Sequence, residues 1–388
     1  MRRSLTQAEA PARIATLGEP RLAAALAAAL RVAGGGRDYT HGFHTYPARM
    51  HPLTARRLLA DVPAGATVLD PFCGSGTVLV EAILRGARAV GVDASPLAIL
   101  VARAKTARSQ YGRDLVVAAR AVSREVLAEG KAARRSGWRA PPRRAAPEAE
   151  LRGWFDPHVR AELEALAAAV AGDDLLTAVL SSILVKVSRR ASDTRGEKVE
   201  RALARGMAAR LFARRAEELA RGLAALWRDA PPRTPAPEIH LGDARALQLA
   251  DASADAVATS PPYAGTYDYL DHQRLRMAFL GLPPGPLAAR EIGARRDADV
   301  GAYARDLGRA LAEVGRVLRP GGRAFVLIGD SLAGDRPVYA DALVREVSPL
   351  RVAAAAAAER PAWGAAERAA FRRAPKREHL MCLTSSGG

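Results

Sequence analysis

The fold is decided by one stretch, Thr-Val-Leu-Asp-Pro-Phe-Cys-Gly-Ser-Gly-Thr at residues 67–77, together with Val-Gly-Val-Asp at residues 90–93. An apolar run that ends at a glycine-rich turn predicts a buried strand, and residues 78–85 after the turn have the composition of a helix. The second apolar run predicts another strand that ends at Asp93. A strand–helix–strand unit with a glycine turn and an acid about 20 residues later is typical of a nucleoside-binding site.

The turn favours one kind of nucleoside ligand. A dinucleotide site has a third glycine three residues after Gly76, but Leu79 occupies that position. Asp70 places a negative charge where a phosphate would bind, and it suits a cationic amino-acid group instead. Gly74 and Gly76 allow the backbone to pass close to a ligand, and Asp93 can accept hydrogen bonds from two ribose hydroxyls. These features favour S-adenosylmethionine as the cofactor.

Two motifs carry a resemblance to a known family. With Asp-Pro-Phe-Cys-Gly-Ser-Gly-Thr at 70–77 and Thr-Ser-Pro-Pro-Tyr at 259–263, the sequence resembles the amino-methyltransferases that modify exocyclic nitrogens of DNA bases. In that family the first motif binds S-adenosylmethionine and the second holds the target amine. The resemblance covers residues 40–105 and 238–335, and it implies an α/β fold with a Rossmann-like, seven-stranded methyltransferase sheet.

The resemblance also implies which residues bind the cofactor. In the family, an acid at the position of Asp243 accepts a hydrogen bond from the adenine amine. Tyr46, with Pro47 and Arg49, resembles a segment that lines the methionine end of the cofactor. The residues expected to bind S-adenosylmethionine are Tyr46, Asp70, Phe72, Gly74, Gly76, Thr77, Asp93 and Asp243.

The second motif suits transfer of a methyl group to an amine. The amine of cytosine or adenine is a weak nucleophile because its lone pair is conjugated with the ring. The Ser260 side chain and the Pro261 carbonyl can accept its two hydrogens, and Pro261 and Pro262 fix the backbone that presents this carbonyl. Tyr263 offers a face for a base extruded from the duplex. Alignment would supply most of the acceleration, so the expected catalytic residues are Ser260, Pro261, Pro262 and Tyr263.

Nitrogen, rather than carbon, is expected to be the methylated atom. Methylation at cytosine carbon 5 requires a cysteine nucleophile, whereas Cys73 lies in the cofactor turn and Cys382 in the last predicted strand. Among the proteins that the chain resembles, a serine at the position of Ser260 is seen more often with cytosine than with adenine. We therefore expect N4-methylcytosine, with N6-methyladenine as the alternative, from a site-specific DNA methyltransferase of the restriction–modification kind.

The order of the two motifs keeps transfer RNA as an alternative to DNA as the substrate. Many DNA amino-methyltransferases place Ser-Pro-Pro-Tyr first, whereas the order here also resembles the guanosine-N2 methyltransferases of transfer RNA. Those enzymes usually have an acid or Asn in place of Ser260, and an amino-terminal RNA-capturing domain for which residues 1–40 are too short. DNA with an extruded base is therefore the expected partner, and RNA is the alternative. A nucleic-acid-binding protein with an inactive core is a third hypothesis, and the intact Asp70, Asp93, Asp243 and Ser260 count against it.

The composition favours a polyanionic partner. The chain has 388 residues and a net charge of +17, although a GC-rich coding sequence would also enrich it in Ala and Arg. Two cysteines provide no disulfide framework, and there is no membrane-spanning stretch or secretory signal. A cytoplasmic, nucleoid-associated protein without a membrane partner is expected. His41, His44 and His51 match no zinc pattern, so no metal is expected.

A helical insertion is expected to interrupt the core. Residues 106–237 have helical periodicity and contain 25 Lys and Arg against 16 Asp and Glu, which suits phosphate contacts and target recognition. Within it, the polar residues 188–195 are expected to form a binding loop, whereas residues 359–377 have no assigned chemistry. The expected parts are 1–40 (helical arm), 41–105 (methyltransferase core, first part), 106–237 (basic helical insertion) and 238–388 (core, second part, closed by an antiparallel pair of strands).

Overall fold

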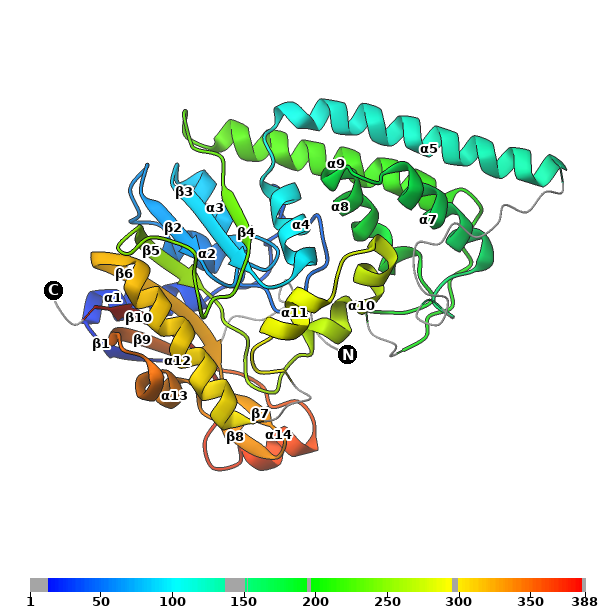
Figure 1. The fold of residues 1–388 in the computed structure, drawn as a ribbon. Helices are drawn as coiled ribbons and strands as arrows, with labels where there is room; N and C mark the ends of the chain where they lie inside the picture. Colours follow the sequence, from blue (N-terminus) through cyan, green and yellow to red (C-terminus); the bar gives the residue numbers. More distant parts are fainter. Residues whose placement is uncertain (1–12, 137–150, 152, 194–196, 295–298, 386–388) are drawn as a thin grey trace.

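The computed structural model describes residues 13–136, 151, 153–193, 197–294 and 299–385, and these residues form one large sheet of eight strands (Figure 1). The strand order is β1-β9-β10-β6-β5-β2-β3-β4, and a separate hairpin joins β7 to β8. The five strands from β6 to β4 are parallel, while β10, β9 and β1 are added antiparallel. The strands are β1 (Ile14–Gly18), β2 (Thr67–Asp70), β3 (Arg88–Asp93), β4 (Glu238–Leu241), β5 (Ala254–Thr259), β6 (Leu318–Gly329), β7 (Ser331–Ala333), β8 (Arg336–Val338), β9 (Arg351–Glu359) and β10 (Arg377–Thr384).

Helices cover both faces of the sheet because successive side chains of a strand point to opposite faces. Val68 of β2 belongs to an apolar cluster that includes residues of α1, α2 and α3, whereas its neighbour Leu69 belongs to one that includes residues of α12 and α13. No helix in the described part of the chain is long and apolar enough to cross a membrane. The helices are α1 (Pro20–Leu30), α2 (Pro52–Leu58), α3 (Thr77–Leu84), α4 (Pro96–Thr106), α5 (Gln110–Ser136), α7 (Pro157–Ala169), α8 (Asp174–Ile183), α9 (Met207–Asp229), α10 (Tyr269–Leu280), α11 (Gly285–Arg290), α12 (Val300–Val317), α13 (Ala340–Val347) and α14 (Ala365–Ala370).

The predicted α/β class is confirmed, and the sheet has one strand more than the seven predicted. The additional strand is β1, whose Leu17 lies opposite Ala355 of β9. The sequence predicts only a helical arm for residues 1–40, and β1 gives no apolar pattern because it lies at the sheet edge with mostly exposed side chains. The predicted helix is present as α1, which packs against the sheet. Through β1 and α1, the described part of residues 1–40 therefore belongs to the sheet and its helical cover.

The segment between β3 and β4 contains the long helices that its periodicity predicts. Figure 1 shows α5 and α9 side by side, with α7 and α8 beside them. Leu115 of α5 and Phe212 of α9 are buried in an apolar cluster that also includes Val101 of α4 and Phe279 of α10. The insertion thus shares its core with two helices of the methyltransferase half. The described residues 188–193 lie outside α-helices and strands, as predicted, whereas 194 and 195 are outside the described residues.

Candidate active site

Residues of both motifs meet at one edge of the sheet. Strands β2, β3, β5 and β6 are parallel, so their carboxyl ends lie at the same edge, where open α/β sheets bind ligands. Asp70 ends β2, Asp93 ends β3, and Ser260 follows β5. Asp243 lies two residues beyond β4, which pairs in parallel with β3. The topology therefore brings together residues that are almost two hundred positions apart.

Two cavities open at this edge and share a wall. The larger one is lined by Asp93 and Asp243 and by residues of α10 and α11, and the smaller one by Asp70 and Thr77. Because the shared wall includes Ser260, the second motif lies where the two cavities adjoin. The residues that line both cavities are Tyr46, Ala48, Phe72, Gly74 and Ser260.

Most of the sequence-predicted site residues line a cavity, and three do not. Gly76, Pro261 and Tyr263 line neither cavity. Pro261 and Tyr263 are the neighbours of Pro262, which lines the larger cavity. Arg49 lines the smaller cavity and donates a hydrogen bond to the His41 carbonyl. The predicted residues that line one or both cavities are Tyr46, Asp70, Phe72, Gly74, Thr77, Asp93, Asp243, Ser260 and Pro262.

The two glycines of the turn have different roles. Both have a left-handed backbone, with φ of 48° at Gly74 and 75° at Gly76, which glycine adopts without strain. A Cβ on Gly74 would lie 3.2 Å from the Tyr46 ring, at the wall of the cavities, whereas a Cβ on Gly76 would lie 3.1 Å from the Cβ of Ala102. Gly74 therefore keeps the ligand side of the turn open, and Gly76 allows α3 to begin close to α4.

The buried carboxylate of Asp70 and the partly buried carboxylate of Asp93 face the cavities without a cation of their own. Asp93 accepts hydrogen bonds from the backbone N–H groups of Gly74 (2.8 Å) and Ser95 (2.9 Å), and Asp70 accepts one from the Thr259 hydroxyl (2.7 Å). Burial raises the pKa of Asp70 to about 7, and it raises the pKa of Asp93 to about 6. Neither carboxylate forms an ion pair with a described Lys or Arg. A cationic ligand would relieve the cost of burying these two charges.

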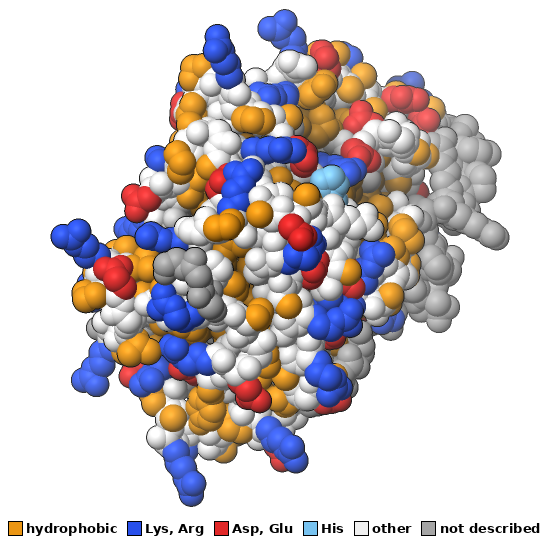
Figure 2. All heavy atoms as spheres, turned by 60° about the vertical axis from the view of Figure 1, so that its left-hand side comes forward, with side chains coloured by type: hydrophobic (Ala, Val, Ile, Leu, Met, Phe, Trp, Pro, Cys, Tyr) orange, Lys and Arg blue, Asp and Glu red, His pale blue; other side chains and the backbone are white. Residues whose placement is uncertain are grey.

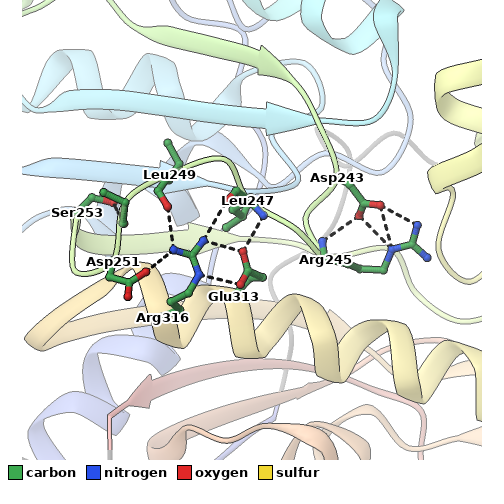
Figure 3. A network of polar contacts seen from close by, with 9 residues as sticks. Asp243, Arg245, Leu247, Leu249, Asp251, Ser253, Glu313 and Arg316 are labelled. Carbon is green, nitrogen blue, oxygen red and sulfur yellow. Dashed lines mark hydrogen bonds and ion pairs between the residues drawn. The ribbon is translucent and has the colours of Figure 1, made fainter.

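Asp243 is held differently, by a network that fixes the loop between β4 and β5 (Figure 3). The Arg245 guanidinium donates to both carboxylate oxygens, at 2.9 Å from Nη2 to Oδ2 and 3.0 Å from Nε to Oδ1. Burial alone would raise the pKa of Asp243, but its bonds to Arg245 outweigh burial and the pKa is lowered. Further along the loop, Arg316 of α12 donates to the Leu247 carbonyl (2.9 Å) and Glu313 accepts from the Leu247 N–H (2.7 Å). Asp243 therefore presents a fixed, ionised carboxylate to the larger cavity.

The second motif is tied to the first and to the neighbouring strands. Thr259 donates its hydroxyl to Asp70, so the last residue of β5 joins the two motifs directly. The Pro262 carbonyl accepts from the Tyr303 hydroxyl at 2.9 Å. Tyr263 donates to the Glu378 carboxylate at 3.2 Å, and its ring lies so close to Gly329 that a Cβ there would be 2.7 Å away. The backbone on both sides of Ser260 is thus fixed by contacts with four elements.

Residues of α10 and α11 line the larger cavity and were not predicted from the sequence. Gln273 is buried and makes two bonds in the wall, because it accepts from the Ser95 hydroxyl and donates to the Tyr46 hydroxyl at 3.0 Å. Arg290 of α11 and Glu291, which follows it, line the same cavity. A polar helix position such as Gln273 carries no signal that separates a cavity residue from a solvated one.

The amino-terminal histidines point to separate partners. His41 lies 2.9 Å from Glu81, His44 lies 2.9 Å from Ser181, and the Nε2 of His51 lies 3.0 Å from the Gly34 carbonyl. Elsewhere among the described residues, one group has the side chains to hold a metal, with its ligand atoms within 4.8 Å of one another. It consists of Asp330, Asp341 and His379.

Comparison with known proteins identifies a methyltransferase domain. Residues 37–138 match the family UPF0020, described as RMKL-like, methyltransferase domain. A stretch of 74 residues is 38% identical to the Type II methyltransferase M.MvaI of Kocuria varians, covering 18% of this chain and 16% of that protein. A stretch of 50 residues is 52% identical to a tRNA (guanine(10)-N2)-dimethyltransferase of Methanothermobacter thermautotrophicus, covering 12% of this chain and 15% of that protein. The chain thus matches only about a sixth of each relative's length.

The family match shows that residues 37–138 resemble a methyltransferase domain, as predicted, and S-adenosylmethionine is the cofactor expected of such a domain. The relatives include a Type II methyltransferase and a transfer RNA methyltransferase, so the polymer and the base stay predictions. Among solved structures, TrmN from Thermus thermophilus aligns with 87% of this chain and 50% of its own, at 14% identity and a TM-score of 0.34. A likeness at this level says nothing about substrate.

Proposed function

We propose that the chain is a DNA methyltransferase that transfers a methyl group from S-adenosylmethionine to an exocyclic amine, with cytosine N4 as the target atom. The proposal rests above all on the bond from Thr259 to Asp70. This bond places Ser260, which lines both cavities, next to the acid that suits the cationic end of the cofactor. The cofactor-binding end of one motif and the amine-holding end of the other are therefore adjacent.

The chain's residues fit the cofactor in two parts. In the larger cavity, Asp93 would accept from the ribose hydroxyls and Asp243 from the adenine amine, since each carboxylate has lone pairs beyond its bonds within the protein. In the smaller cavity, the carboxylate of Asp70, which is buried and has no ion pair with a described residue, would face the positively charged methionine end. Tyr46 and Gly74 form part of the wall between the two ends. When bound, S-adenosylmethionine supplies a methyl group on a sulfonium, which an amine takes by in-line displacement.

The target amine would be held by Ser260 and Pro261. The Ser260 hydroxyl and the Pro261 carbonyl would each accept one hydrogen, which favours a tetrahedral nitrogen whose lone pair is free. No described hydrogen bond within the protein uses the Pro261 carbonyl. As the nitrogen–carbon bond forms and the carbon–sulfur bond breaks, the nitrogen becomes acidic and its proton passes to water. Tyr263, held by Glu378, would offer a ring face to the extruded base.

One experiment tests polymer and base together. The full chain is incubated with S-adenosylmethionine labelled in the methyl group and with either duplex DNA or transfer RNA, and the digested nucleosides are identified. We expect label in N4-methylcytosine of DNA, and less label after the same time in the reaction with Ser260→Ala. The variant Ser253→Ala controls for nonspecific loss of activity, because Ser253 is a partly exposed serine in the loop between β4 and β5, away from both linings. Label in N6-methyladenine would change the base but keep the polymer.

Methylation of guanosine N2 in transfer RNA is the second candidate function, because two observations favour it. The cofactor motif precedes Ser-Pro-Pro-Tyr, and the matched stretch is 52% identical to a tRNA (guanine(10)-N2)-dimethyltransferase. Label in N2-methylguanosine of transfer RNA, with unlabelled DNA, would replace the DNA proposal by this one. The cofactor roles of Asp70, Asp93 and Asp243 would be unaffected by that result.

A further inference from the structure

The segment between β9 and β10, residues 360–376, has no role in the chemistry described above, and we call it the β9–β10 loop. It is folded onto the β7–β8 hairpin and closed upon itself. Phe371 contacts the Tyr339 ring edge to face at 5.9 Å, and the Lys376 ammonium lies 2.8 Å from the Glu367 carboxylate. The Arg360 N–H donates to the Lys376 carbonyl at 2.8 Å, which holds the two ends of the loop together. The loop therefore has a defined surface.

The base of the loop is anchored beside the second motif. Glu378 accepts from the Tyr263 hydroxyl at 3.2 Å and from the Arg360 guanidinium at 2.6 Å, so one carboxylate joins the loop to Tyr263. Asp330, which follows β6, accepts from the Arg377 N–H at 2.9 Å and lies 3.0 Å from His379. Asp330 and His379 thus help to anchor the base of the loop.

The loop presents charge and an aromatic ring to solvent. It contains five Arg and Lys but only one acid. Arg360 and Lys376 are neutralised by Glu378 and Glu367. The remaining three basic residues are exposed and form no ion pair with any described residue; they are Arg368, Arg372 and Arg373. Trp363 is 62% exposed, whereas Trp154 is only 3% exposed.

Exposed guanidinium groups beside an exposed indole are the side chains that bind nucleic acid, since arginines pair with phosphates and aromatic rings stack on bases. Net charge alone does not locate such a surface, because Figure 2 shows basic side chains spread over the whole of one face. The β9–β10 loop differs from these scattered charges because its Arg360 bonds to Glu378 of β10, which in turn accepts from Tyr263. In Figure 1, α14 of the loop and the insertion helices lie toward opposite ends of the molecule, with α10 and α11 between them.

We propose that the β9–β10 loop binds duplex DNA beside the target base, with Arg368, Arg372 and Arg373 on phosphates and Trp363 stacked on a neighbouring base. The proposal rests on the proposed function, since it takes the duplex to be the substrate. A duplex engaged at once by this loop and by the insertion would span the site. The Tyr263 hydroxyl donates to Glu378, which also accepts from Arg360 of the loop. Glu378 would therefore connect the loop that binds the flanking DNA to the ring that receives the extruded base.

The test compares two triple variants of the full chain. The first replaces Arg368, Arg372 and Arg373 with Gln. The matched control replaces three exposed arginines that form no described ion pair and lie away from the loop, namely Arg21 and Arg31 at the ends of α1 and Arg351 at the opposite end of β9. Affinity for labelled duplex DNA is measured over a series of salt concentrations, and cofactor affinity is measured by calorimetry to show that the site is intact.

The loop variant should bind DNA more weakly, and the slope of log affinity against log salt should fall by about 2–3, roughly 0.9 for each lost phosphate contact. The control should keep the wild-type slope, and both should keep cofactor affinity. Trp363→Ala should weaken DNA binding about 5- to 150-fold, as expected for one lost stacking contact. A loop variant with the control's slope would overturn the loop proposal while DNA methylation stands. A wild-type chain that binds no duplex DNA would overturn both proposals.

Discussion

The charge of Asp70 should set the affinity for S-adenosylmethionine near neutral pH. Burial raises the pKa of this carboxyl to about 7; the bonds from Thr259 and the Phe72 N–H oppose the rise, and the nearby Asp93 adds to it. Below pH 7 the free protein therefore holds a neutral acid, and a cationic ligand must displace its proton. Affinity should rise as pH rises toward and through 7, and it should fall as pH is lowered.

The magnitude follows from linkage, since one pKa unit corresponds to 1.36 kcal/mol. If the cofactor binds only ionised Asp70, each pH unit below 7 should weaken binding by up to about tenfold. Asp93, with a pKa of about 6, should add a second dependence below pH 6. Asp70→Asn keeps an oxygen for the Thr259 hydroxyl but cannot ionise. It should weaken binding at pH 7.5 by roughly 1.5–3 kcal/mol and remove the dependence between pH 6 and 7.5.

The assay is calorimetric titration of S-adenosylmethionine into the full chain between pH 5.5 and 7.5, where an α-amino group is largely protonated. Asp61→Asn serves as a control, because Asp61 is an exposed acid that lines neither cavity. The control should reproduce the wild-type profile. A flat wild-type profile, or an Asp70→Asn profile as steep as the wild type, would refute the assignment of Asp70 to the cationic end of the cofactor.

Three further substitutions separate the roles proposed for the site. Asp93→Ala should weaken cofactor binding by roughly 1.5–3 kcal/mol, because charge-assisted bonds to the ribose are lost; unchanged calorimetric affinity would remove this residue from the site. Ser260→Ala should lower the single-turnover rate more than DNA affinity, since its contact strengthens as the amine becomes tetrahedral; equal losses in both would contradict that role. Tyr263→Ala should weaken binding of target duplex by about 1–3 kcal/mol, and an equal loss on duplex lacking the target site would argue for a structural effect.

The sequence predicts the parts of the fold that depend on local pattern. The strand, turn and helix around Gly74 follow from apolar runs and glycine positions, and parallel topology then places Asp70 and Asp93 at one edge. Strand β1 escapes prediction because an edge strand with exposed side chains has no apolar alternation. The role of Gln273 cannot be predicted because it arises only from packing, when α10 comes against Ser95 and Tyr46. The sequence pattern thus identifies helices and strands, whereas tertiary contacts determine which side chains close the cavity.

Helix α10 also explains why the insertion cannot be treated as a separate domain. Gln273 faces the larger cavity, whereas Arg276, one turn later, is buried, donates to the Ser181 carbonyl of α8 and pairs with Asp193 at 2.7 Å. Removing residues 106–237 would leave this buried guanidinium without its carboxylate and would uncover the apolar faces of α4 and α10. Loss of cofactor binding in such a deletion would therefore follow from a damaged cavity wall. A contribution of the insertion to DNA binding is therefore tested by substituting its exposed arginines, with α10 left in place.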